Sequence, residues 1–133
     1  MKSNKKLIHK TLLLIDDENN WLDAMEEALE AESYKVVTAD SGQLALSKLQ
    51  KVKPDLILSD VRMPDMNGYD LYEKVKAIPK LNKVPFVFMS SLDDYDAKRV
   101  AKSIGADDYV IKPYDTQEIK RIILELLNRF KKF

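Results

Sequence analysis

Several acidic and polar residues stand directly after short apolar runs in this sequence. The run 12–15 is followed by Asp16 and Asp17, and the run that begins at residue 55 ends in Asp60. An apolar run that ends in a carboxylate and then breaks at proline and glycine is typical of a buried strand that presents an acid to a loop. Two further runs end in polar residues in the same way, with Ser90 after 86–89 and Lys112 after 109–111.

This set of residue types favours phosphoryl chemistry. Three carboxylates in one crevice repel one another, so one must gain a proton or a cation must neutralise them. A hard divalent ion with oxygen ligands, above all Mg²⁺, suits such a group and allows a phosphoryl group to approach it. Lys112 can hold one phosphoryl oxygen and Ser90 can hydrogen-bond another. Asp60 is then placed as a nucleophile that forms an aspartyl phosphate.

The elements that position these residues follow from the periodicity of the chain. Apolar residues at helical spacing follow each strand-like run, so strands and helices alternate five times. We expect helix N-caps at Ser41, Asn67 and Asp115, a fourth helix that opens at Asp93 or Asp94, and Gly105 at its end. The expected strands are 12–15, 35–39, 55–60, 86–89 and 109–111.

Strict alternation of strands and helices predicts an α/β fold. It requires right-handed crossovers and a parallel sheet that is covered on both faces. We expect the flavodoxin-like, doubly wound (βα)5 arrangement, with five parallel strands in the order 2-1-3-4-5. In such sheets ligands bind outside the carboxyl ends of the strands, at the switch point between strands 1 and 3. The three acids, Ser90 and Lys112 would then converge in one crevice.

Length, net charge and cysteine content limit the classes of protein to which this chain can belong. The 133 residues fit a basic N-terminal tail over 1–10 and one domain over 11–133. Lys+Arg and Asp+Glu are both 22, and this zero net charge argues against a nucleic-acid module. Cysteine is absent, which excludes disulfides and thiolate metal sites and is compatible with the cytoplasm. No apolar stretch approaches the length of a membrane span.

Taken in order, these motifs resemble the bacterial response-regulator receiver domain over nearly the whole chain. Each piece is weak alone, but together, at the expected strand ends, they are highly specific. The matching pieces are Ile15-Asp16-Asp17-Glu18, Asp60 with Met63-Pro64 and Gly68, Ser90, and the run 105–113 from Gly105 to Pro113.

The resemblance implies a role for each site residue. Asp60 is the phosphoacceptor, and Asp17, Asp60 and the Arg62 carbonyl ligate Mg²⁺, while Asp16 acts on the metal mainly through water. Ser90 is the switch hydroxyl, Tyr109 is the switch aromatic residue, and Lys112 holds the phosphate. Receivers of this family usually carry a cis peptide before the proline that follows the lysine, which is Lys112-Pro113 here.

The resemblance also implies partners. We expect a cytoplasmic switch that takes a phosphoryl group from a histidine kinase or a phosphotransfer protein. It would be no enzyme beyond its own phosphorylation and dephosphorylation. Its fourth helix, fifth strand and fifth helix would change and control an output domain, a target protein or a homodimer, with no direct contact to nucleic acid or membrane. The last helix carries a broad apolar set that fits either a dimer seam or a wide core stripe: Ile119, Ile122, Ile123, Leu126, Leu127, Phe130 and, beyond it, Phe133.

Three other functions fit these residues less well. A phosphatase of the haloacid-dehalogenase type expects its nucleophile on the first strand with a second Asp two residues on, whereas Arg62 lies two residues after Asp60. An FMN carrier needs a hydroxyl- and glycine-rich phosphate loop after the first strand, where this chain has acids. A degenerate receiver that only binds a partner conflicts with the complete set of acids, hydroxyl and lysine.

Overall fold

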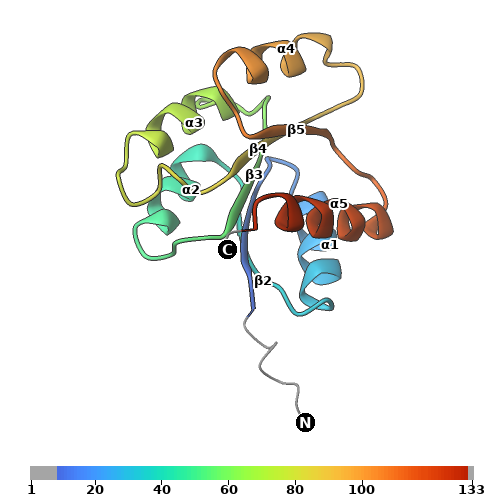
Figure 1. The fold of residues 1–133 in the computed structure, drawn as a ribbon. Coiled ribbons are helices and arrows are strands. Elements are labelled where there is room, and N and C mark those ends of the chain that lie inside the picture. Colours follow the sequence, from blue (N-terminus) through green and yellow to red (C-terminus); the bar gives the residue numbers. More distant parts are fainter. Residues whose placement is uncertain (1–8, 132–133) are drawn as a thin grey trace.

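The computed structural model of this protein describes residues 9–131, and within them it contains one five-stranded parallel sheet. The strand order is β2-β1-β3-β4-β5, as the sequence predicts. Strands and helices alternate along the chain without exception (Figure 1). The elements are β1 (Thr11–Ile15), α1 (Asn19–Glu30), β2 (Lys35–Ala39), α2 (Gly42–Leu49), β3 (Leu56–Asp60), α3 (Gly68–Lys76), β4 (Phe86–Ser90), α4 (Tyr95–Ser103), β5 (Asp108–Ile111) and α5 (Thr116–Arg129).

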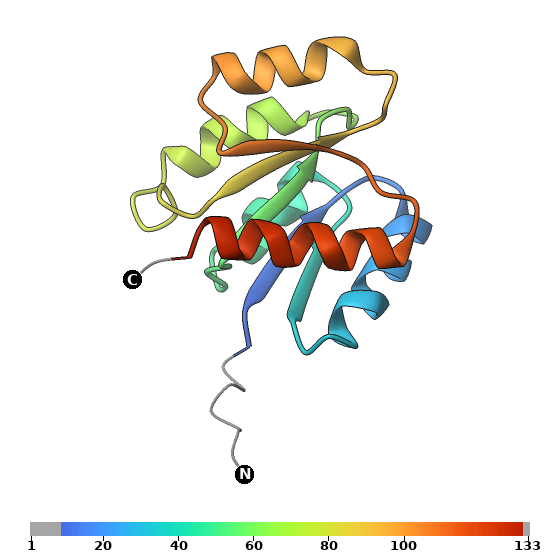
Figure 2. The same cartoon turned by 45° about the vertical axis from the view of Figure 1, so that its right-hand side comes forward.

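The sheet separates two apolar cores, because successive side chains of a strand point to opposite faces. Leu13 and Ile15 pack with α2, α3 and α4, whereas Leu12 and Leu14 pack with α1 and α5. Figures 1 and 2 show these two helix layers on either side of the sheet. Every residue of β3 and β4 is buried, so the centre of the sheet is a rigid base for the residues that follow it.

The strand register brings the polar strand ends to one edge. Ile15 of β1 lies opposite Ser59 of β3, and Asp60 lies opposite Met89 of β4. Ser90, the last residue of β4, lies opposite Ile111 of β5, directly before Lys112. All pairs are parallel, so the carboxyl ends of β1, β3, β4 and β5 meet at the same edge, as expected from the alternation.

Most apolar residues of helix α5 face the core, whereas Leu124 is 56% exposed. Four of the residues that could have formed a dimer seam are buried, and Leu127 and Phe130 pack against the same cluster. The stripe is wide because α5 contacts α1 as well as the sheet. The structure thus supports the wide core stripe rather than a seam at these positions, and Phe133 lies outside the described residues. The buried four are Ile119, Ile122, Ile123 and Leu126.

The predicted helix ends are largely confirmed. Ser41 caps α2, and Asn67 forms a full capping box with Asp70 at the start of α3. Asp115 accepts a hydrogen bond from the Gln117 N–H at 2.7 Å. Gly105 closes the α4 segment with a φ of +87°, in the left-handed region that glycine favours. Within residues 9–131 no helix has the length and apolar character that a membrane span requires.

Gly68 is required by a close approach of two backbone segments. Its N–H donates to the Val61 carbonyl at 2.9 Å, and a Cβ placed on it would lie 2.4 Å from the Asp60 carbonyl oxygen. A Cβ on Gly42 would instead meet the flexible end of Met66, which can move aside. Gly68, unlike Gly42, is therefore needed for helix α3 to start against the end of β3.

We therefore predict that Gly68→Ala destabilises the protein by roughly 1–3 kcal/mol, because backbone has to shift to relieve the overlap. Gly42→Ala is the matched control, and we expect a smaller loss because only the Met66 side chain has to move. The free energy of unfolding in urea, measured for both variants, checks this. Equal losses in the two variants would contradict the close-approach explanation.

Candidate functional site

The three predicted acids form one cluster at the carboxyl edge of the sheet. Asp16 and Asp17 follow β1 and Asp60 ends β3, and one carboxylate oxygen from each lies within 4.8 Å of the others. Asp16 is fully buried, Asp60 is 9% exposed, and Asp17 is open to solvent. The sequence prediction that these acids converge is confirmed, and they are the group of acids in the described chain that could hold a metal ion.

The cluster carries the electrostatic signature of crowded, buried acids. Burial raises the pKa of Asp60 to about 7, and the negative charge of Asp16 adds to this effect. Burial likewise raises the pKa of Asp16. The Val61 N–H donates to Asp60 Oδ1 at 2.9 Å and fixes that carboxylate at the end of β3. Three oxygen donors that resist joint ionisation are the ligands that a hard divalent cation prefers, so the residues fit Mg²⁺.

Lys112 opposes the acid cluster with its positive charge. Its side chain is buried, and Nζ lies 2.7 Å from Asp16 Oδ2 and also contacts the Glu18 carboxylate. Burial by itself lowers the pKa of Lys112, but the nearby carboxylates of Asp16 and Glu18 outweigh it, so the pKa is raised overall. The ammonium also lies over the Trp21 ring, 4.9 Å from its centroid. Lys112 is therefore a charged group held next to the acids.

Ser90 and Tyr109 are joined directly. The Ser90 Oγ and the Tyr109 hydroxyl lie 2.5 Å apart, and either can be the donor. Ser90 is buried at the end of β4, and Tyr109 is partly buried on β5. The two residues that the resemblance names as switch residues thus share one hydrogen bond.

The Arg62 side chain turns away from the acid cluster. Its Nε and Nη2 donate to the two carboxylate oxygens of Asp94 at 2.7 and 2.9 Å. This bond holds the pKa of Asp94 below its usual range. Asp94 is the N-cap residue of α4, and its side chain makes no capping hydrogen bond. The resemblance assigns only the carbonyl of Arg62 to the metal, and that assignment stays a prediction.

The expected cis peptide is wrong for this structure. All peptide bonds within residues 9–131 are trans, Lys112-Pro113 included. The trans form is the lower in energy for an X-Pro bond, by about 0.5–1 kcal/mol. In this conformation the Pro113 carbonyl accepts a hydrogen bond from Trp21 Nε1 at 2.7 Å.

Sequence reasoning assigned no site role to Glu18 or Trp21, although both contact Lys112. Glu18 is the last residue of the Ile15-Asp16-Asp17-Glu18 motif, so the sequence alone indicates that it lies near the acids. Trp21 has helical spacing with other core residues, and 92 residues separate it from Pro113. No local pattern links such distant positions, so only the fold could reveal this contact.

The fold and the acid-lysine site together define a receiver domain of two-component signalling. The family model described as "Response regulator receiver domain" matches residues 12–124, and the chain belongs to this family. This membership argues against the phosphatase and the FMN carrier. It confirms the resemblance seen in the sequence.

The individual relatives agree with this family. "Response regulator SaeR" of Staphylococcus aureus (strain USA300) is 38% identical over 122 residues, which are 92% of this chain and 52% of that protein. A putative response regulator from Chloroflexus aurantiacus is 31% identical with a TM-score of 0.81, covering 93% of this chain and 99% of that one. The chemotaxis protein CheY4 of Vibrio cholerae is 27% identical with a TM-score of 0.82, covering 90% and 99%. This chain spans about half the length of the curated relatives it matches.

The raised pKa of Asp60 generates a prediction about stability. Its folded pKa of about 7 lies above the ordinary value of 3.8, so between these values the folded protein binds more protons than the unfolded chain. Stability due to this group is therefore present at low pH and falls as the pH rises from 3.8 to about 7. Without divalent metal, we expect Asp60→Asn to be more stable than the wild type above pH 7, by roughly 1–4 kcal/mol.

Urea unfolding in a chelator over a series of pH values checks this prediction. The advantage of Asp60→Asn should shrink toward pH 4, because the wild-type carboxyl is then neutral as well. Asp23→Asn, at an exposed position of α1, is the matched control and should show no such trend. An advantage of constant size at every pH would rule out the charge explanation.

Proposed function

We propose that this chain is a phosphorylation-activated switch that accepts a phosphoryl group on Asp60. The donor is a histidine kinase or a phosphotransfer protein, and the reaction depends on Mg²⁺. The observation that carries the proposal is the juxtaposition of three carboxylates with one buried lysine at the carboxyl edge of the sheet. The receiver family places the chain in two-component signalling.

In this proposal each acid has its own relation to the metal. Asp17, Asp60 and the Arg62 carbonyl would hold Mg²⁺, and Asp16 would act on it through water. When bound, the ion supplies positive charge that offsets the carboxylates and the phosphoryl oxygens. Asp16 suits an outer role because its Oδ2 already pairs with Lys112.

The transfer itself is a displacement at phosphorus. A carboxylate oxygen of ionised Asp60 forms the new bond to phosphorus, and the bond between phosphorus and the donor imidazole nitrogen breaks. The imidazole leaves with the electron pair of that bond. Lys112 then holds one phosphoryl oxygen and Ser90 donates to another. Attack by water on phosphorus then breaks the bond to the Asp60 oxygen, releases inorganic phosphate and restores the carboxylate. In this proposal the chain acts only on its own phosphoryl group.

The switch in this proposal runs through Ser90 and Tyr109. A hydroxyl can accept one hydrogen bond while it donates another, so Ser90 can accept from the tyrosine and donate to the phosphoryl group. This new contact favours the conformation in which the two hydroxyls are joined, which is a population shift between two states. This population shift would transmit the effect of phosphorylation at the end of β3 to Tyr109 on β5.

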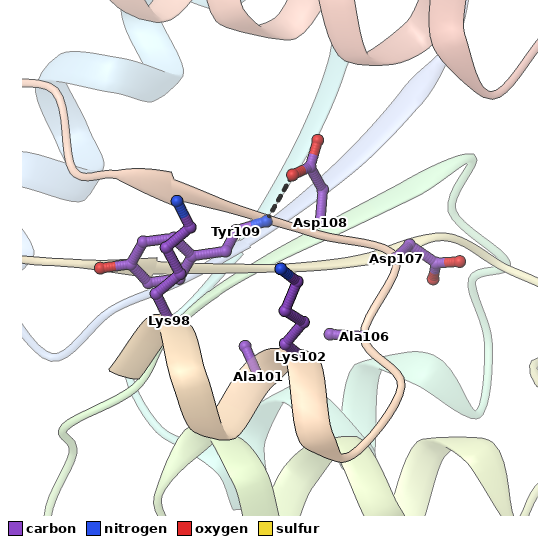
Figure 3. Close-up of a pocket in the computed structure, with 7 residues that line it drawn as sticks. All are labelled: Lys98, Ala101, Lys102, Ala106, Asp107, Asp108 and Tyr109. Atoms are coloured by element: carbon purple, nitrogen blue, oxygen red, sulfur yellow. Dashed lines mark hydrogen bonds between the residues drawn. The ribbon is translucent and has the colours of Figure 1, made fainter. Parts of the chain in front are cut away.

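The face around Tyr109 suits a partner. A groove of about 340 Å³ lies between α4 and β5, and Figure 3 shows Lys98 and Lys102 extending from α4 toward Tyr109. Asp107 and Asp108, which also line it, are ion-paired with Lys76 and Arg129. Neither Lys98 nor Lys102 pairs with an acid among residues 9–131, so the groove presents uncompensated positive charge. We propose that α4, β5 and α5 control an output domain, a target protein or a second copy of the chain.

Two broader assignments belong to the same proposal. The domain extends over 11–133, of which the family model covers 12–124, and the proposed basic tail falls mainly on residues 1–8, outside the described residues. The resemblance to bacterial receivers supports a location in the cytoplasm, where the kinase domain of a histidine kinase would reach the chain.

The proposed function predicts Mg²⁺-dependent phosphorylation at Asp60. Incubation with phosphoramidate, followed by intact-mass measurement, should show one added phosphoryl group with Mg²⁺ and almost none in a chelator. Asp60→Ala should abolish the uptake, and Asp23→Ala, at an exposed position of α1, should retain it. Labelling of Asp60→Ala at another residue would remove Asp60 from its role.

The ligand assignment predicts unequal effects of the two adjacent acids. Asp17→Asn should weaken Mg²⁺ binding by at least roughly ten-fold, because it removes a charged ligand. Asp16→Asn should weaken it less, because the carboxylate of Asp16 is already committed to Lys112. Calorimetric titration of Mg²⁺ into the three proteins checks this order. The same affinity in Asp17→Asn and the wild type would contradict the assignment.

A further inference from the structure

One side chain, Trp21 of α1, makes two directed contacts with two consecutive residues after β5. Its ring lies under the Lys112 ammonium, 4.9 Å from Nζ, and its Nε1–H donates to the Pro113 carbonyl at 2.7 Å. The hydrogen bond is buried, and the Trp21 side chain is 8% exposed. The single tryptophan of the chain thus contacts the proposed phosphate-holding lysine and its neighbour at once.

Core packing explains only part of this arrangement. Trp21 belongs to the cluster on the α1 and α5 side of the sheet, where its neighbour Leu22 is also buried. A leucine or phenylalanine could fill such a position. Neither could donate a hydrogen bond to the Pro113 carbonyl, and an aliphatic side chain offers no negative ring face to an ammonium.

The segment 112–113 is held from two sides. On one side, the Lys112 N–H donates to the Ser90 carbonyl of β4 at 2.8 Å. On the other side, Trp21 Nε1 donates to the Pro113 carbonyl. The Lys112 ammonium is paired with Asp16 and Glu18 and forms no ion pair with Asp60. Its location beside the acid cluster therefore depends on α1 as well as on the sheet.

We propose that Trp21 is a positioning residue for phosphoryl transfer, acting through Lys112. Its ring face and its indole N–H together fix the lysine so that the ammonium stands at the edge of the acid cluster, within reach of a phosphoryl group on Asp60. This inference rests on the proposed role of Lys112. It adds a residue of α1 to the machinery that determines how fast the site is phosphorylated.

Three variants separate the two contacts from core packing. Trp21→Leu removes both contacts, whereas Trp21→Phe keeps a ring face and loses the N–H donor. Leu22→Val is the matched control, because it shortens a buried side chain on the same helix without a described contact to Lys112. Each protein is first shown to be folded by its urea-unfolding transition at the assay temperature.

The measured quantity is the rate of phosphorylation by phosphoramidate with Mg²⁺. We expect Trp21→Leu to be roughly ten-fold slower than the wild type, Trp21→Phe to be intermediate, and Leu22→Val to be unchanged. Reductive methylation with formaldehyde, read residue by residue by mass spectrometry, reports the location of the amine. Lys112 should be protected in the wild type and Leu22→Val and should react faster in Trp21→Leu.

A double-mutant cycle tests whether Trp21 acts through the lysine. In a Lys112→Met background, the further change Trp21→Leu should have little effect on the residual rate. If the rate losses of Trp21→Leu and Lys112→Met multiply in the double mutant, Trp21 has a structural role only and the inference is overturned. Equal slowing in Trp21→Leu and Leu22→Val would overturn it as well. If Lys112→Met has no residual rate, the comparison of Trp21→Leu with Leu22→Val and the methylation pattern decide. A wild type that takes up no phosphoryl group on Asp60 would instead defeat the proposed function itself.

Discussion

The balance between three carboxylates and one buried ammonium is the constraint on which this site depends. Asp16 is wholly buried and Asp60 nearly so, and neither environment favours a negative charge. Lys112 pairs with Asp16, and burial together with the charge of Asp16 still raises the pKa of Asp60 to about 7. The site is therefore suited to take up positive charge, which is what the proposed Mg²⁺ and phosphoryl chemistry require.

Such a cluster can exist only on a scaffold that does not yield to its repulsion. The central strands β3 and β4 are buried throughout, and close-packed interiors resist local displacement. Gly68 allows α3 to start against the end of β3, where any side chain would push the Asp60 backbone away. On the opposite side, α1 supplies Trp21 to hold the segment that carries Lys112. Packing on both faces of the sheet thus fixes the charges at its edge.

Two connections run from the acid cluster toward α4 and β5. Ser90 reaches Tyr109 through a partly buried hydroxyl pair. Arg62, two residues after Asp60, reaches Asp94 at the first turn of α4 through a bidentate ion pair. In this second connection the Arg62 side chain is 63% exposed and the Asp94 side chain is 12% exposed, so the pair lies at the rim of the domain. An ion pair at that rim can open without unfolding the domain, which suits the proposed change of the face formed by α4 and β5.

The sequence by itself determined the order of elements and the residues at the strand ends, because apolar periodicity and caps such as Ser41 and Asn67 act over a few residues. The strand order was expected from the flavodoxin-like arrangement, and the pairing of the strands in the structure confirms it. It also indicated that the acids after 12–15 and at residue 60 meet, since parallel strands share one carboxyl edge. Only the tertiary structure decided the partners of Lys112, the trans peptide before Pro113, and the burial of the α5 stripe. These depend on contacts between residues far apart in the chain, where side-chain reach and packing, rather than local spacing, select one arrangement.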